Sequence, residues 1–463
     1  MNKNDINRLA TGKISRLLWE YSLPAVVGML VMSLYNVIDR IFIGQGVGTD
    51  AITGLTITFP VMNISAAIGV LIGAGASARV SIMLGAKKTR DAELALGNSL
   101  TLIVCNAVIY ITLMWLFLDW ILIKFGASET SLPYARDFMT YILPGMLIMN
   151  VGFSLNNVMR ASGYPMKAMV AMIISAVLNI ILAPIFIFVL DMGIKGAAIA
   201  TDIAMTLFTI YVLAHFANKK HTLHFTKGCF RPKLNIVLAI IGIGAAPATI
   251  NLASSFINAI INNKLLEFGG DHAVAAAGIF TTYTSLICMA VVGICQGMQP
   301  IVGYNYGAGN FDRLKRAYWI TVGCATTLVT IGAIFGLSWP HLIARAFTID
   351  SELIAATSHG LSIALLCFFV VGFQIVSTTF FQSIGQVWQS IILSLSRQVF
   401  FLIPLLLLLT RWFDLDGVWM SFPLSDILAT IITTTMIIFQ FKKIDKMRTK
   451  ELNHASKQEK TAK

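Results

Sequence analysis

The sequence predicts an all-α integral membrane protein whose twelve transmembrane helices form two pseudo-symmetric bundles of six. Three observations lead to this prediction: the apolar composition, the placement of the Lys and Arg residues, and a repeat that relates the two halves of the chain. Of the 463 residues, 57% are hydrophobic and only 12% are charged, about half the charged share of a soluble domain. This composition excludes a disordered chain, a coiled coil and an ordinary soluble enzyme.

Long apolar runs, separated by polar or Gly- and Pro-containing breaks, predict the individual spans. A helix needs about 20 residues to cross a bilayer, and each run reaches that length. A helix also satisfies its own backbone in lipid, which an open sheet does not. The predicted spans are 17–43, 52–82, 94–123, 134–160, 166–190, 195–217, 234–264, 273–303, 314–338, 353–382, 387–410 and 417–441.

The basic residues predict how these spans are oriented. With the N-terminus placed in the cytoplasm, 26 of the 34 Lys and Arg residues fall on the cytoplasmic side. Cytoplasmic loops are enriched in Lys and Arg, so this bias predicts an even number of spans and two cytoplasmic termini. The net charge of +12 therefore indicates membrane topology, and we expect contact with the lipid bilayer and no nucleic-acid partner.

The two halves of the chain repeat at an offset of 222 or 223 residues. Because each half holds six spans, the repeat is parallel and predicts a pseudo-two-fold axis along the membrane normal, with a substrate path between two lobes. We predict an N-lobe over 1–217, a cytoplasmic linker over 218–233, a C-lobe over 234–441 and a basic cytoplasmic tail over 442–463. The matching positions are Pro24 with Pro247, Gly75 with Gly297, Gly85 with Gly307, and Gly163 with Gly385.

Several of these segments together resemble a known family. The first span contains SLP and ends in DRIFIG, the second closes with GAGASARVSIMLGA, and the eighth closes with PIVGYNYGAGN. In combination they resemble the multidrug and toxic compound extrusion (MATE) family, in its bacterial DinF/MepA-like branch, over residues 14–441. The resemblance implies a V-shaped fold of two six-helix bundles in a bacterial plasma membrane. It also implies an antiporter that expels organic cations and other drugs in exchange for protons or sodium.

The resemblance also implies a cation site in the N-lobe. The acidic residue of the family's first helix matches Asp39, the asparagine of the fifth helix matches Asn179, and the threonine of the sixth helix matches Thr201. Two positions depart from the family pattern: the aspartate before the fifth-helix proline is Ala183, and the glutamate that another branch carries in the seventh helix is Ser255. These departures leave Asp39 more isolated and favour protons over sodium as the coupling ion.

The charged residues inside spans support this interpretation from their own chemistry. A charge at the bilayer centre costs at least about 2.5–3.5 kcal/mol, so such residues usually face an interior or a cavity. Asp39 lies one helical turn from Tyr35 and Asn36, which suits a proton or cation site; the alternative is an interhelical hydrogen-bond network. Asp202, next to Thr201, either supplies the charge missing at position 183 or faces another direction.

In the C-lobe, Arg397 and Asp426 are both deep within spans, and we predict that they pair, because an unpaired buried charge is costly. The pair is either a structural clasp or part of a drug or proton site. We expect the remaining polar residues of the spans to line the substrate cavity together with Tyr35 and Asn36. These residues are Asn157, Gln296, Gln299 and Gln382.

Other functional classes fit the sequence less well. A flippase for a lipid-linked precursor, the alternative of the same broad superfamily, needs a cationic cavity, and Arg397 is the only arginine predicted deep in a span. A membrane enzyme needs clustered acids, histidines or a nucleophile triad, and ATP coupling needs a phosphate-binding loop; the sequence predicts neither. A channel or receptor fits the parallel repeat less well than alternating access does. We expect no enzyme activity, no cofactor, no bound metal and a monomer.

Overall fold

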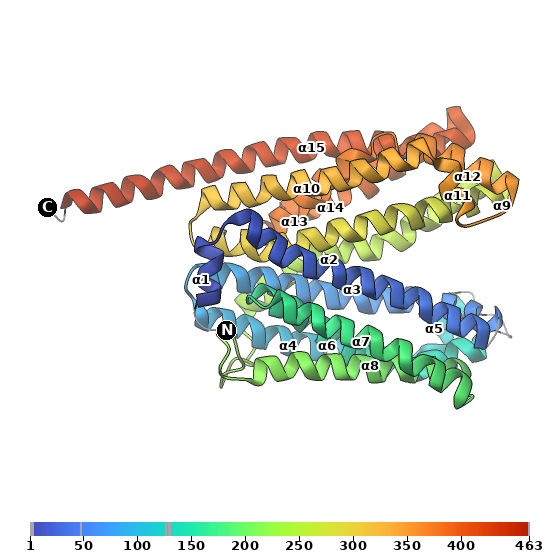
Figure 1. The fold of residues 1–463 in the computed structure, drawn as a ribbon, viewed down its shortest axis with the longest axis horizontal. Helices are drawn as coiled ribbons and strands as arrows, with labels where there is room; N and C mark the ends of the chain where they lie inside the picture. The colour runs from blue at the N-terminus through green and yellow to red at the C-terminus, as the bar shows by residue number, and fades with distance from the viewer. Residues whose placement is uncertain (1–3, 47–48, 126, 128–130, 462–463) are drawn as a thin grey trace.

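The computed structural model describes residues 4–46, 49–125, 127 and 131–461, with the side chains of 4–7, 36, 40, 44–46, 49–54, 56, 255 and 450–461 excepted. Helices account for nearly all of the described residues, and no strand occurs among them. The helices form two bundles that lie close together at the end carrying α1 and diverge toward the other end (Figure 1). This arrangement is the predicted V.

The N-lobe follows the short helix α1 (Asn4–Thr11). One predicted span, 94–123, is divided at Phe117 into α4 and α5, and another, 166–190, ends in the π-helical turn η1. The helices of the lobe are α2 (Ile14–Gly46), α3 (Thr49–Gly85), α4 (Thr89–Leu116), α5 (Leu118–Lys124), α6 (Leu132–Ala161), α7 (Pro165–Pro184), η1 (Ile185–Val189) and α8 (Gly193–Ala217).

The C-lobe contains two pairs of spans that run on as single helical segments. The backbone is non-helical at Gly270 within α9 and at Asp414 within α15, and each point marks the turn between two spans. The helices are α9 (Leu234–Gly307), α10 (Phe311–Ser338), α11 (Pro340–Arg345), α12 (Ser351–Ala364), η2 (Phe368–Val370), α13 (Val371–Ser383), α14 (Val387–Leu395), η3 (Ser396–Leu402) and α15 (Ile403–Thr461).

The number of spans among the described residues agrees with the prediction. Nine helical segments are long and apolar enough to cross a membrane, and two of these contain the breaks at Gly270 and Asp414. A further pair consists of α12 and of η2 continued by α13. The two parts together are long and apolar enough to cross a membrane, and they are bent by 57° relative to each other. Dividing the two long segments and taking the bent pair as one span gives twelve.

The bent pair is a departure from the straight helix that the sequence predicts over 353–382. The bend falls where no proline occurs, and the following helix places Gly372 directly against the backbone of Ala325 in α10. A side chain at position 372 would not fit there. The contact between α13 and α10, which is not visible in the local sequence pattern, therefore accompanies the break.

Residues with left-handed backbone confirm the repeat at the level of single turns. Such backbone is rare outside glycine, so its recurrence at matched positions shows that the two lobes use the same turns. Two matched pairs have an offset of 222 and one, at the opposite end of the molecule, has an offset of 223. They are Lys87 (φ 60°) with Gly309 (φ 72°), Gly163 (φ 103°) with Gly385 (φ 74°), and Asp191 (φ 50°) with Asp414 (φ 45°).

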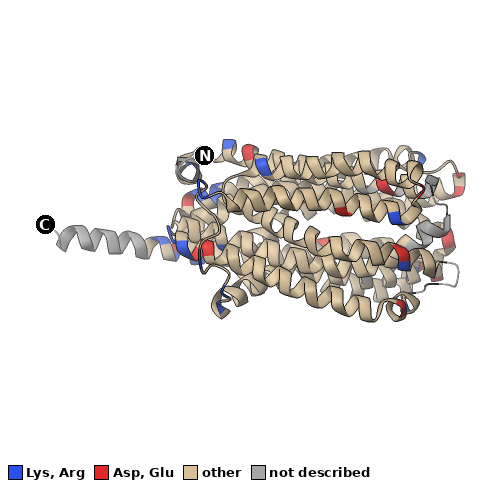
Figure 2. Ribbon diagram, turned by 90° about the horizontal axis from the view of Figure 1, so that it is seen from below, with Lys and Arg blue, Asp and Glu red and all other residues tan. Residues whose placement is uncertain are grey.

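The charged residues lie mostly at the two ends of the bundles, and the long middle is nearly uncharged (Figure 2). The helix α1 and the loop from α8 to α9 lie at the end where the lobes meet, and the last turns of α15 project beyond the bundles on the same side (Figure 1). The predicted cytoplasmic segments are thus on one side of the molecule. The C-terminal tail continues α15 as a helix to Thr461.

At the end where the lobes meet, glycines bring α3 and α9 into backbone contact. Gly75 of α3 lies against the carbonyl of Ile240, and Gly244 of α9 lies against the carbonyl of Leu71. Small residues allow this kind of close approach between membrane helices. Gly75, which the sequence matches with Gly297 across the repeat, therefore serves the contact between the lobes.

Candidate functional site

Tyr35 of α2 is the centre of a polar cluster inside the N-lobe. Its side chain is only 7% exposed, and its hydroxyl lies within hydrogen-bonding reach of Thr201 of α8. Asp39, one turn further along α2, lies close enough for its charge to act on this hydroxyl. The residue spacing on α2 predicts this common face, whereas the approach of α8 is a result of the tertiary structure.

Asn179 and Thr201 join α7 and α8 next to this cluster. The side-chain nitrogen of Asn179 donates a hydrogen bond to the hydroxyl oxygen of Thr201 at 2.9 Å, and Asn179 is buried. Thr201 thereby links Asn179 to Tyr35. The structure brings together the three positions that match the family's cation site, around one tyrosine.

Asp202 enters the same region from a different direction. Its carboxylate lies in the space left by the missing side chain of Gly145 in α6, where a Cβ atom would collide with it. Neighbouring helical residues diverge by about 100°, so Asp202 faces α6 while Thr201 faces α7. Asp202 nonetheless lies close enough to Tyr35 for a charge on its carboxylate to act on the tyrosine hydroxyl, which places a second carboxyl group at the edge of the cluster.

Ala183 occupies the position where the family has an aspartate. It is fully buried and belongs to an apolar cluster that includes Val61, Leu143 and Ile187. No polar group is needed at this point in the helix packing. That Asp202 takes over the role vacated at position 183 stays a prediction.

Of the cavity residues predicted in the N-lobe, Asn157 does not join the cluster. The side chain of Asn36 lies outside the described residues. Asn157 donates a hydrogen bond to the carbonyl of Phe153 in its own helix at 3.1 Å, and its amide faces Gly73 of α3. Asn157 is therefore a contact between α6 and α3 in this conformation.

Gln296 and Gln299 lie at the contact between the lobes. Gln299 of α9 donates to the carbonyl of Ala74 in α3 at 3.3 Å. Gln296 accepts a hydrogen bond from the guanidinium of Arg160 in α6. Both glutamines thus connect the C-lobe to the N-lobe at the end where the V is closed. Gln382 of α13 is buried inside the C-lobe.

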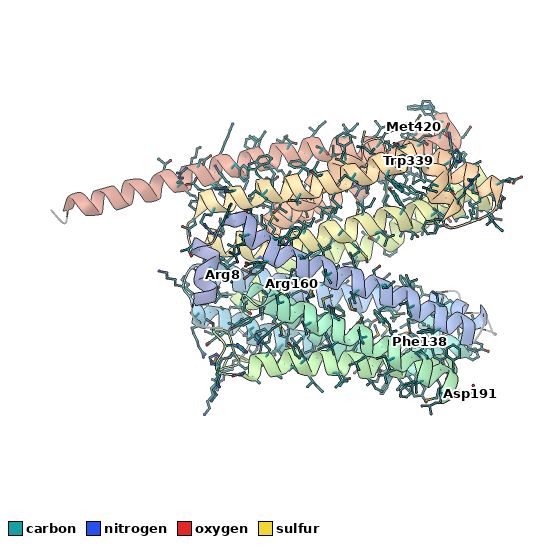
Figure 3. All side chains as sticks on the ribbon, viewed as in Figure 1. Arg8, Phe138, Arg160, Asp191, Trp339 and Met420 are labelled. Atoms are coloured by element: carbon teal, nitrogen blue, oxygen red, sulfur yellow. The ribbon has the colours of Figure 1, made fainter. Side chains whose placement is uncertain are left out.

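Arg160 is the residue that the sequence places wrongly. It is the last residue of the predicted span 134–160, a position that suggests exposure to the cytoplasm, but its side chain is only 4% exposed. It lies on the N-lobe toward the end carrying Arg8, far from Phe138 and Asp191 at the other end (Figure 3). It also donates to Asn156 at 3.3 Å. Arg397 is therefore not the only arginine enclosed by the helices.

The predicted pair in the C-lobe is present. The guanidinium of Arg397 in η3 donates to a carboxylate oxygen of Asp426 at 2.6 Å, and Asp426 is 1% exposed. Gln374 of α13 donates to the backbone carbonyl of Asp426 at 2.7 Å and to the hydroxyl of Thr430 at 2.8 Å. Nothing in the local sequence pattern marks this glutamine as a neighbour of the pair. The π-helical turn η3 carries Arg397, and such turns are frequent at functional sites.

Comparisons with known proteins give the family. The sequence pattern of the MatE family matches residues 24–185 and again 234–408, one match in each lobe. The chain is 25% identical over 432 residues to the multidrug export protein MepA of Staphylococcus aureus strain MSSA476, covering 92% of this chain and 93% of that protein.

Solved structures agree with this result. The MATE multidrug transporter DinF-BH, solved in complex with a ligand, is 38% identical with a TM-score of 0.85, covering 92% of this chain and 96% of that one. An outward-facing MATE family transporter of the MOP superfamily has a TM-score of 0.89 at 24% identity, covering 95% and 98%, which shows the fold. The repeated match and the likeness over both lobes establish that this chain belongs to the MatE family of membrane transporters.

Proposed function

We propose that this protein is a secondary active exporter that expels drug-like organic cations in exchange for protons, by alternating access of a path between its two lobes. The proposal is supported by the names of the relatives, a multidrug export protein and a multidrug transporter. The single observation that carries it is the cluster of Tyr35, Asp39 and Thr201, with Asp202 at its edge, inside the N-lobe.

Asp39 supplies the exchange chemistry in this proposal. A carboxylate in a dry, apolar setting favours its protonated form, and a nearby cation favours its ionised form. A proton and an organic cation then compete for Asp39, and one replaces the other on the two sides of the membrane. Sodium prefers several oxygen ligands, and the alanine at position 183 removes one, which favours protons.

The test uses protein reconstituted in vesicles, with proton and sodium gradients imposed separately and export of a fluorescent cationic rhodamine dye followed by its emission. Wild-type protein should export the dye under the proton gradient. Asp39→Asn keeps the shape of the side chain, removes its titration and should abolish export. Asp202→Asn should weaken export and leave part of it, since Asp202 lies at the edge of the cluster.

The control is Asp191→Asn, the same change in an exposed turn at the far end of the N-lobe. Asparagine tolerates the left-handed backbone of that position, so export should be unchanged. Export by Asp39→Asn at the wild-type rate would show that Asp39 is not the coupling group. Export driven by sodium alone would overturn the assignment of protons.

A flippase for a lipid-linked precursor is the alternative. It requires cations available to a pyrophosphate, whereas Arg397 is paired with Asp426 and Arg160 is engaged by Gln296 and Asn156. These contacts favour the exporter.

We further propose that the protein lies in a bacterial plasma membrane with both termini in the cytoplasm. The clustering of the predicted cytoplasmic segments at one end of the molecule supports this topology (Figure 1). Reporter domains fused after Lys442 and into the 218–233 loop should report cytoplasm, and one at Gly270 should report the outside. An outside signal from the 218–233 loop would overturn the topology.

A further inference from the structure

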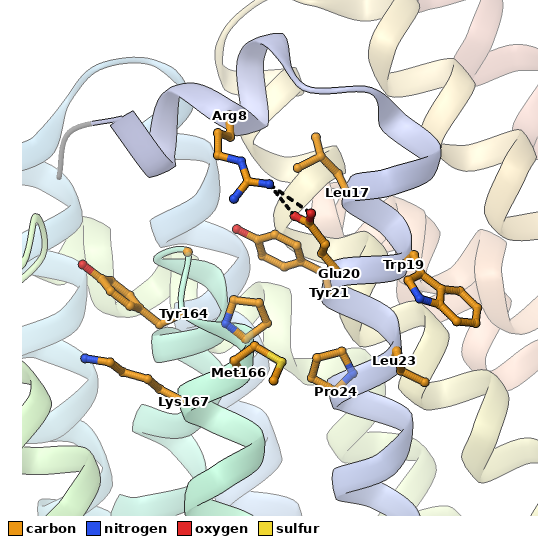
Figure 4. A pocket seen from close by; sticks show the side chains of 12 residues that line it. Arg8, Leu17, Trp19, Glu20, Tyr21, Leu23, Pro24, Tyr164, Met166 and Lys167 are labelled. Carbon is orange, nitrogen blue, oxygen red and sulfur yellow. Dashed lines mark hydrogen bonds and ion pairs between the residues drawn. The ribbon is translucent and has the colours of Figure 1, made fainter. Parts of the chain in front are cut away.

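A cavity lies between α2 and the start of α7, at the end of the N-lobe where the lobes meet. Its volume is about 570 Å³, within the range of small-molecule sites. One wall is the first turns of α2, with Trp19 and Leu23, and the other is the segment from Tyr164 to Lys167 (Figure 4). The cavity is separate from the cluster around Tyr35.

Most of the lining of this cavity is apolar, and the cavity opens on the outer surface of the lobe. Trp19 is 68% exposed and Met166 is 56% exposed, and Pro24 and Pro165 complete the lining. In a bilayer this surface meets acyl chains. Trp and Tyr are enriched at the level of the lipid headgroups, and Trp19, Tyr21 and Tyr164 occur together here.

Two cationic side chains, Arg8 and Lys167, lie on different sides of the cavity and form its basic rim (Figure 4). Arg8 donates to both carboxylate oxygens of Glu20, at 3.0 and 2.9 Å, and Arg16 donates to the same carboxylate at 2.9 Å. One carboxylate thus serves two guanidiniums. Across the cavity, the ammonium of Lys167 lies 5.3 Å from the centre of the Tyr164 ring. Among the residues that line the cavity, two are cationic, Arg8 and Lys167, and one is anionic, Glu20, so the lining carries a net positive charge.

His221, in the loop after α8, adds no further charge at neutral pH. Its ring nitrogen is 3.0 Å from the hydroxyl of Tyr164. Burial, and next the positive charge of Lys167, lower the pKa of His221 below its usual value. The positive charge facing the cavity therefore comes from Arg8 and Lys167.

We propose that this cavity binds an anionic phospholipid of the cytoplasmic leaflet, with an acyl chain against Trp19, Leu23 and Met166 and the headgroup phosphate at the basic rim. The combination of a mostly apolar lining with a net positive charge at the rim fits an anionic lipid. The net charge disfavours an organic cation, and the apolar lining disfavours free phosphate. The leaflet follows from the proposed topology, and the binding does not depend on transport.

The test places the protein in nanodiscs and measures quenching of Trp19 by lipids with brominated acyl chains. Phosphatidylglycerol and phosphatidylcholine with identical brominated chains are compared at the same mole fraction. The part of the quenching that disappears in Trp19→Phe belongs to Trp19. We expect half-maximal quenching of Trp19 at a lower mole fraction of phosphatidylglycerol than of phosphatidylcholine.

Lys167→Gln should reduce this preference about fivefold, since a basic residue near an anionic lipid surface contributes about that factor. Lys88→Gln is the matched control, because Lys88 is an exposed lysine between α3 and α4 that does not line the cavity. The preference of the Lys88→Gln variant for phosphatidylglycerol over phosphatidylcholine should equal that of the wild type. Inorganic phosphate added to phosphatidylcholine nanodiscs should leave the Trp19 fluorescence unchanged.

Three results would overturn the proposal. Equal quenching by the two lipids would make the cavity an ordinary lipid-facing groove. Equal losses in Lys167→Gln and Lys88→Gln would assign the preference to the general surface charge. A response of Trp19 to inorganic phosphate alone would assign the rim to a soluble anion. Thermal unfolding of each variant in detergent verifies that the fold is retained.

Discussion

Gly85, at the end of α3, lies directly against the backbone carbonyl of Tyr304 in α9, with no room for a Cβ atom between them. The same contact recurs with the lobes exchanged, because Gly307 lies against the carbonyl of Ile82. The two glycines are 222 residues apart in the sequence, and so are Ile82 and Tyr304, whose carbonyls they contact. The pseudo-two-fold axis therefore passes between these two contacts, and the closed end of the V depends on a glycine from each lobe.

Replacing either glycine should weaken this closed end. We expect Gly85→Ala and Gly307→Ala to lower the free energy of unfolding by about 1–3 kcal/mol, the usual cost of inserting a methyl group where there is no space. Thermal unfolding in detergent measures the loss. Gly323→Ala is the control, because a Cβ atom there meets nothing within 4 Å; it should be neutral or slightly stabilising, since alanine favours helix.

The contact between Arg160 and Gln296 joins the lobes through a buried charge. Gln296→Leu removes the acceptor and leaves the guanidinium with one partner fewer, so we expect a loss of about 1.5–3 kcal/mol in the free energy of unfolding. Arg160→Leu with Gln296→Leu removes both polar groups and should cost less than Gln296→Leu alone. A larger loss in the double variant than in the single one would mean that Arg160 stabilises the fold by other contacts.

The pair of Arg397 and Asp426 should behave as a coupled unit. Arg397→Leu leaves a buried carboxylate without its cation and should destabilise the protein by about 3–5 kcal/mol. Adding Asp426→Leu should restore part of this loss, because the uncompensated charge is then gone. Unfolding of both single variants and the double variant gives the coupling energy, and strictly additive losses would contradict the contact.

The linker from α8 to α9 is held to the N-lobe by Asn98 of α4. The Asn98 amide donates to the carbonyls of Cys229 and Arg231 at 3.0 and 3.1 Å, and its oxygen accepts from the backbone of Lys233 at 2.7 Å. Asn98→Leu should cost about 3 kcal/mol in the free energy of unfolding, roughly 1 kcal/mol for each bond.

Thr101→Val provides a graded comparison for Asn98. Thr101 makes one bond to the linker, to the carbonyl of Phe230 at 2.9 Å, so its loss should be about 1 kcal/mol. Proteolysis of the loop checks the same point, since the 218–233 segment should be cleaved faster in Asn98→Leu than in Thr101→Val. Equal cleavage rates would show that Asn98 does not hold the linker.

The polar cluster shows which contacts of the site can be predicted from the sequence. Tyr35 and Asp39 share a helix face by their spacing, and this relation holds in the structure. Gly145 carries no such signal, because the space that it leaves is filled by Asp202 from another helix. Arg160 misleads in the other direction: a basic residue at the end of an apolar run has the same local pattern whether it faces water or the opposite lobe.

The sequence by itself determined the twelve spans, their repeat and the pairing of Arg397 with Asp426. These follow from local rules, since lipid requires long apolar helices and a buried charge requires a partner. Only the tertiary structure decided which helices meet: that Thr201 reaches Tyr35, that Asp202 lies in the space at Gly145, and that Gln296 and Gln299 join the lobes. The reason is physical, because the apolar periodicity of a membrane helix is nearly the same on its lipid-facing and protein-facing sides, so close packing between backbones selects the partners.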